Sequence, residues 1–238
     1  MNKLLFLLLS TVLCTACGKK YSIEGLSSLS RLDGKKMYIK VPRGNEMVSI
    51  DSAEVIHGAF RMQGRVDSVV IASLYVGNDC ILPVVIESGK IQINIDNAGM
   101  TVKGTPLNNC FNEFMMKKNA LDDMAYEVER LESRMIMDGK SPGEIQAEVE
   151  RQRSELGAEV DKLAKTFIQD NYDNVLGPGV FLMFCNGLPY PMMTPVMEEI
   201  VNDAPETFTN HPLIKEFVSV ARSNMSRIQE AQSRSAVN

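Results

Sequence analysis

The spacing of the apolar residues changes once along this chain, near Gly104, and this change constrains the fold more than any other feature of the sequence. Before it, apolar and polar residues alternate, as at Ile91, Ile93 and Ile95, which is the period of a strand with one buried face. After it, apolar residues recur at steps of three and four, which is the period of an amphipathic helix. A chain in which a run of strands precedes a run of helices folds as an α+β protein.

The strand-like part predicts an antiparallel β-sandwich over residues 17–104. About eight short strands fit there at a spacing near ten residues, with turn signals between them such as Asp33-Gly34 and His57-Gly58. Residues 84–86 are apolar on both faces, so we expect a central strand there. Pro83 cannot donate to a strand ladder and indicates the start of that strand or a bulge.

The helical part, residues 105–238, predicts a long helical hairpin followed by shorter helices. One apolar stripe covers residues 107–135 and a second covers residues 145–167. The short break between them ends in a capping box that begins at Ser141, so we expect two long helices packed antiparallel. The polar tail after Arg227 is expected to fray.

The first residues have the order of a secretory signal peptide. Lys3 gives a positive start, and the apolar run over residues 4–13 is too short for a membrane span, which needs about 20 apolar residues. Small residues then precede Cys17, an order that resembles the lipobox of bacterial lipoproteins, although Cys14 stands where leucine is usual. We expect residues 1–16 to be a signal peptide, and the resemblance implies lipid attachment at Cys17; ordinary secretion without a lipid is the alternative.

The resemblance to lipoproteins also implies a location. A lipid on Cys17 would hold the protein at a bacterial membrane of the cell envelope without crossing it. Lys19 and Lys20 follow directly, whereas surface-exported lipoproteins of this kind tend to carry acidic residues there, so the resemblance implies a periplasm-facing protein. Cys14 and Cys17 also have the spacing of a redox dithiol, but cleavage before Cys17 would remove Cys14, and we reject that interpretation.

Composition excludes several classes of function. A net charge of −5 gives no basis for binding nucleic acid. His57 and His211 are isolated and offer no metal-ligand spacing, and the sequence contains no phosphate loop, dinucleotide fingerprint or nucleophile elbow. We therefore predict no metal, no cofactor and no catalytic residue, and a protein that is not an enzyme.

Three groups of side chains remain as weaker candidates. Cys80, Cys110 and Cys185 are interpreted as buried, unreactive thiols. The methionine pairs 115–116 and 192–193 could form an adaptable groove for a partner, but we favour the filling of an irregular core.

A carboxylate at the end of a predicted strand is the last of these candidates. Glu87 is either a site residue or the partner of a tight turn at Gly89, and we favour the turn.

Four segments carry a resemblance to a known family, and they are Ile50–Ala53, His57–Phe60, Glu87–Ile91 and Gly104–Asn108. In this order and spacing they resemble domain-of-unknown-function family 4369, over about residues 20–110. This family is common in Bacteroidetes, usually between a lipoprotein signal and a thioredoxin-like peroxidase or reductase domain. No C-x-x-C follows Cys17, so we expect this chain to lack the thioredoxin domain, and the resemblance implies location and architecture but no catalytic residue.

Three hypotheses for function follow. The first, which we favour, is a non-enzymatic binding or scaffolding lipoprotein. The second is an accessory that acts in trans on a thioredoxin-like thiol-disulfide enzyme, as the fused relatives do within one chain. The third is an enzyme whose site forms only between the sandwich and the helices; a deep cleft with several ionisable groups would favour it, and a packed apolar junction would argue against it.

Overall fold

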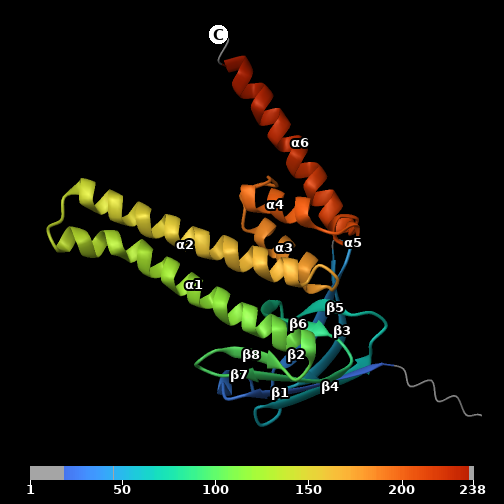
Figure 1. Cartoon of the computed structure of the whole chain (residues 1–238). Coiled ribbons are helices and arrows are strands. Elements are labelled where there is room, and N and C mark those ends of the chain that lie inside the picture. Colours follow the sequence, from blue (N-terminus) through green and yellow to red (C-terminus); the bar gives the residue numbers. More distant parts are fainter. Residues whose placement is uncertain (1–18, 45, 236–238) are drawn as a thin grey trace, which may run out of the picture.

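The computed structural model describes residues 19–44 and 46–235, so the predicted signal peptide and Cys17 lie outside the described residues. It confirms the predicted fold class, because eight strands in two four-stranded sheets are followed by two long helices and further helices. Figure 1 shows the strands gathered at one end of the molecule, with the helices extending away from them.

The first sheet has the strand order β4-β1-β7-β8. Its strands are β1 (Lys20–Ser27), β4 (Ala59–Arg65), β7 (Gly89–Ile95) and β8 (Met100–Lys103). Strands β1 and β7 run parallel, with Ile23 opposite Ile91, and the other neighbours run antiparallel. This parallel pair departs from the antiparallel pairing that we expected throughout, and it places the first strand inside the sheet.

The second sheet has the strand order β3-β2-β5-β6, and all its neighbours run antiparallel. Its strands are β2 (Lys36–Arg43), β3 (Glu46–Glu54), β5 (Val70–Val76) and β6 (Asp79–Ile86). A single turn of 3-10 helix, η1 (Ser30–Leu32), precedes β2.

The alternating apolar residues of both sheets meet in one core. Ile23, Ile91 and Ile93 of the first sheet and Ile39 and Leu74 of the second have no exposed surface. Full burial of such a side chain contributes about 1.5–3 kcal/mol to folding. The alternation that predicted the strands therefore also selects the face that each strand turns toward the other sheet.

Strand β6 is apolar on both faces for a reason other than the predicted one. It is an edge strand of its sheet, not a central one. Val84 and Ile86 point into the sandwich core, whereas Val85 joins the core of the helices on the opposite face. Pro83 pairs with Ser73 inside the strand, which an edge strand tolerates because one of its sides needs no ladder donors.

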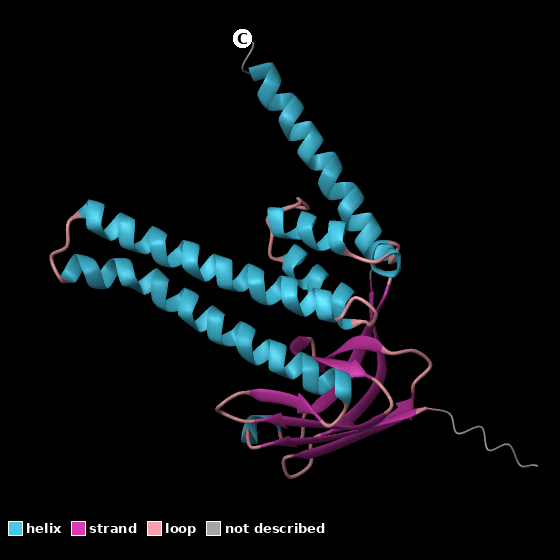
Figure 2. Ribbon diagram, viewed as in Figure 1, coloured by secondary structure: helices cyan, strands magenta, loops and turns pink. Residues whose placement is uncertain are grey.

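Two long helices form the predicted hairpin, α1 (Pro106–Met137) and α2 (Pro142–Asp170), which Figure 2 shows side by side. The capping box at the start of α2 is confirmed. The Ser141 hydroxyl accepts a hydrogen bond from the Glu144 backbone N–H at 3.4 Å, and the Glu144 carboxylate accepts one from the Ser141 backbone N–H at 3.0 Å. These bonds satisfy two backbone donors at a helix start.

Four further helices follow: α3 (Leu176–Asn186), α4 (Pro195–Asp203), α5 (Glu206–Thr209) and α6 (Pro212–Ser235). Helix α6 continues to Ser235, past Arg227, where we expected the chain to fray. None of the helices in residues 19–44 and 46–235 is both long enough and apolar enough to cross a membrane.

The helices pack on the outer face of the second sheet. Phe114 of α1, Ile168 of α2 and Phe181 of α3 are buried in one cluster with Val85 of β6. A Cβ atom at Gly179 of α3 would lie 2.2 Å from the side chain of Ile71 in β5, so α3 lies directly against that strand. The sandwich and the helices are therefore in direct apolar contact.

Candidate binding site

A buried amide fixes the start of α1 to the edge of strand β6. Asn108 Oδ1 accepts a hydrogen bond from the Val85 N–H at 2.9 Å. Asn108 Nδ2 donates to the Val85 carbonyl at 2.8 Å and to the Thr105 hydroxyl at 2.8 Å. The Asn108 side chain thus satisfies backbone groups that a further strand would otherwise pair, and it does so in a site that is only 1% exposed.

Glu87 caps helix α1 from the end of β6. Its Oε1 accepts hydrogen bonds from the backbone N–H groups of Leu107 at 2.9 Å and Asn108 at 3.1 Å. A carboxylate in this position satisfies two unpaired donors and lies at the positive end of the helix dipole. The N-cap residue Thr105 forms no such bond with its side chain. Glu87 therefore serves the helix rather than the turn at Gly89 that we favoured.

Two glycines allow the segments of this junction to approach. Gly89 has a φ of 131°, and a Cβ there would lie 2.9 Å from the methyl group of Thr105. Gly104 has a φ of 102°, and a Cβ there would lie 2.3 Å from the Lys90 carbonyl oxygen. Both positions require glycine for conformation and for space. The segments around Gly89 and Gly104 are separate in the sequence, and the structure brings them together where α1 begins. We call this meeting point the socket of α1.

A pocket of about 710 Å³ opens beside this junction, between the second sheet and the helices. Ligand sites have volumes of about 300–1,000 Å³, so the pocket is large enough for a small molecule. Its wall is mostly apolar and combines elements from both parts of the chain; Met47, Val69, Ile71, Phe111, Leu182 and Leu213 line it. Met47, Val69 and Leu213 are at least 38% exposed, so apolar side chains border an opening to solvent.

Three ionisable side chains line the pocket, Tyr172, Asp173 and His211. The Tyr172 hydroxyl donates to the Ile200 carbonyl at 2.7 Å, and burial followed by the negative charge of Asp203 raises the Tyr172 pKa. Within the described residues no hydrogen bond joins Asp173 to His211.

His211 lines the pocket, but its Nδ1 atom is buried and presents no surface to it. This atom has no hydrogen-bond partner among the residues that the structure describes, and a buried polar atom without a partner costs about 1–3 kcal/mol. The sequence shows His211 only as an isolated histidine, because the residues around it come from distant segments. The other histidine, His57, lies in a turn with a φ of 51°.

The three thiols divide into two kinds. Burial raises the pKa of Cys185 to about 12 and, as the largest cause, also raises the pKa of the half-buried Cys110. Cys80 is exposed, so its assignment as a buried thiol is wrong. The reason is a register shift: Leu74 pairs with Leu82 but Tyr75 pairs with Cys80, so a bulge turns Cys80 to the outer face of the sheet.

The other candidates lie apart from the pocket. Met193 is buried and Met115 packs against the helical core, as core filling predicts, but Met116 is 58% exposed. The described part of the chain contains no group of three or more His, Cys, Asp or Glu side chains arranged to hold a metal ion. Cys17, the predicted lipid attachment site, lies outside the described residues, and that assignment stays a prediction.

Comparison with known proteins gives one result. Residues 21–111 match the family described as Domain of unknown function (DUF4369), and a search of curated proteins found no match to the chain. The matched range runs from β1 into the first turns of α1 and contains both Glu87 and Asn108. The resemblance drawn from the four sequence segments is therefore confirmed over residues 21–111, which match the model of the DUF4369 family.

Proposed function

We propose that the chain is a non-enzymatic binding protein of the bacterial cell envelope, anchored by a lipid on Cys17, which holds an apolar ligand in the pocket between the sandwich and the helices. The pocket is the observation that carries the proposal. An apolar wall with a few polar groups is the usual composition of a small-molecule site.

The geometry also favours a class of ligand. The wall, which is mostly apolar, fits an apolar body. Burying the apolar body contributes about 25 cal/mol for each Å² removed from water.

The pocket can be tested with an uncharged apolar fluorescent probe, N-phenyl-1-naphthylamine. Leu213 lines the pocket and is 51% exposed, so Leu213→Lys places an unpaired charge in the wall without disturbing the buried core. We expect the dissociation constant of the probe to rise about tenfold, which is a loss of about 1.4 kcal/mol.

The matched control is Val220→Lys. Val220 lies on the same helix, α6, and is 43% exposed, but it is not part of the pocket wall. Its probe affinity should equal that of the unchanged chain. Equal affinities for both variants would show that the probe binds elsewhere, and the proposed site would be abandoned.

The anchor has a separate test. The intact mass of the protein extracted from its own membranes should exceed that of the polypeptide from Cys17 by one diacylglycerol group. Cys17→Ala should remove this mass and release the protein from the membrane fraction. A membrane-free native protein of purely polypeptide mass would refute the anchored part of the proposal and leave the pocket to be judged by the probe.

A further inference from the structure

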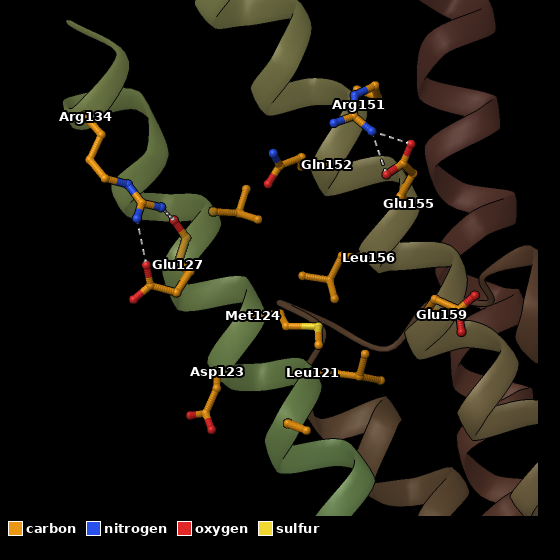
Figure 3. Close-up of a pocket in the computed structure, with 12 residues that line it drawn as sticks. Leu121, Asp123, Met124, Glu127, Arg134, Arg151, Gln152, Glu155, Leu156 and Glu159 are labelled. Atoms are coloured by element: carbon orange, nitrogen blue, oxygen red, sulfur yellow. Dashed lines mark hydrogen bonds and ion pairs between the residues drawn. The ribbon is translucent and has the colours of Figure 1, made fainter. Parts of the chain in front are cut away.

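The helical hairpin carries a second hollow that the proposed function does not use. Phe114 and Ala164 belong to the buried cluster near the sandwich, and Val128 and Ile145 belong to a separate cluster toward the tip. Between these clusters a groove of about 640 Å³ separates α1 from α2 (Figure 3). The hairpin is therefore well packed at both ends and open in its middle.

The floor of this groove is apolar. Leu121 and Met124 of α1 point toward Leu156 of α2 across the gap (Figure 3), and Met124 is 57% exposed. The small side chain of Ala120 also lines the groove and leaves space beside them. An apolar seam between two helices is the type of surface that an amphipathic helix covers.

The rim of the groove is acidic. Four carboxylates and two arginines line it. Both arginines already have partners, Arg134 with Glu127 at 3.2 Å and Arg151 with Glu155 at 2.7 Å. Asp123 and Glu159 have no ion pair within the described residues. A helix that occupies the groove would therefore be favoured by basic side chains.

Helix α6 has the complementary properties. Beyond Met225 it carries two basic residues, Arg227 and Arg234, and one acidic residue, Glu230, in a chain whose net charge is −5. Its first half is held by the body, where Ile214 and Ala221 are buried and Arg222 pairs with Glu198 at 2.9 Å. Its second half extends beyond the body (Figure 1), and there Ile228 continues the apolar stripe while 38% exposed.

We propose that the C-terminal part of α6, residues 226–235, lies in the α1–α2 groove of a second copy of this chain. Both complementary surfaces are present on one chain, so two copies related by a two-fold axis can exchange their α6 helices and close the assembly. Within one chain the two surfaces diverge, because α6 points away from the hairpin (Figure 1). At about 1.5 Å per residue, the ten residues 226–235 extend about 15 Å beyond the part of α6 that the body holds.

Cross-linking in native membranes tests this contact without removing the predicted anchor. Two differently tagged full-length chains are co-expressed in a Cys80→Ser background, one with Met124→Cys and the other with Ile228→Cys. A short bifunctional maleimide should join the two tags. The matched control replaces Met124→Cys by Met137→Cys, which is on the same helix and 77% exposed but outside the groove, and it should give at least fivefold less product.

Charge reversal then separates this contact from chance proximity. Arg227→Glu should reduce the cross-linked product about tenfold, and Glu159→Lys in the receiving chain should restore most of it, because attraction across an interface depends on sign. Equal product from the groove and tip cysteines, or no product at all, would overturn the proposal. A cross-link from the groove to another protein in place of the second tag would overturn it equally.

Discussion

The substitution Asn108→Ala offers the sharpest test of how the two parts of the chain are joined. The wild-type side chain is 1% exposed and bonds both backbone groups of Val85, at 2.9 and 2.8 Å. Alanine would remove these partners without giving water access to the site. It would leave the Val85 N–H, the Val85 carbonyl and one bond of the Thr105 hydroxyl without a partner.

The expected cost follows from these contacts. A buried polar group without its partner costs about 1–3 kcal/mol, so the two backbone groups together imply a loss of about 3–4 kcal/mol in the free energy of unfolding. In a domain of 150–250 residues each kcal/mol lowers Tm by about 2–4 °C, so Tm should fall by about 10 °C.

Urea titration and thermal melting, followed by far-UV circular dichroism, measure this loss. The control is Asn109→Ala, one position along the same helix, where the exposed side chain accepts one hydrogen bond from the Gly104 N–H at 2.9 Å. It should cost about 1 kcal/mol or less, because water replaces the lost partner. If both variants lose the same stability, the Asn108 amide does not hold the junction, and the reasoning above is wrong.

Three further predictions concern other parts of the chain. Gly104→Ala should destabilise by clearly more than Gly34→Ala in urea titrations, since a Cβ meets a carbonyl oxygen at 2.3 Å in the first case and nothing within 4 Å in the second. Iodoacetamide at pH 8 should modify Cys80 in the native protein but not Cys185. The raised pKa of Cys185 also means that the stability of the fold is full below pH 9 and falls as pH rises from 9 toward 12, and Cys185→Ala should reduce this slope. Ser141→Ala should cost about 1 kcal/mol in the same titrations, and an unchanged midpoint would show that the capping box contributes nothing.

Features that depend on neighbouring residues were predictable from the sequence. The change of apolar period near Gly104 predicted both the two-sheet sandwich and the hairpin, because each period selects one buried face. The capping box at Ser141 was equally predictable, since its bonds join residues three apart. The N-cap at Thr194 is similarly local, and its hydroxyl accepts from the Met197 N–H at 3.3 Å.

Features that depend on pairing between distant segments were not predictable. The apolar run around Val85 was assigned to a central strand because the sequence shows that both faces are covered but not what covers them. Cys80 has the same parity as the buried residues of its strand, and only the bulge opposite Tyr75 turns it outward. The pocket could not be predicted for the same reason, since it combines His211 with residues of the second sheet that lie more than a hundred positions earlier in the chain.

Different parts of the chain form the matched family segment, complete the pocket and form the groove. Residues 21–111 build the sandwich and the socket that fixes the start of α1, whereas α3 and α6 complete the pocket and residues 120–159 supply the whole groove. A change in the socket, such as Asn108→Ala, should therefore lower stability while leaving the probe affinity of the folded protein unchanged. A change at Leu213 should lower the probe affinity while leaving the stability of the fold unchanged. If stability and affinity instead fell together in both variants, the pocket and the socket would act as one unit.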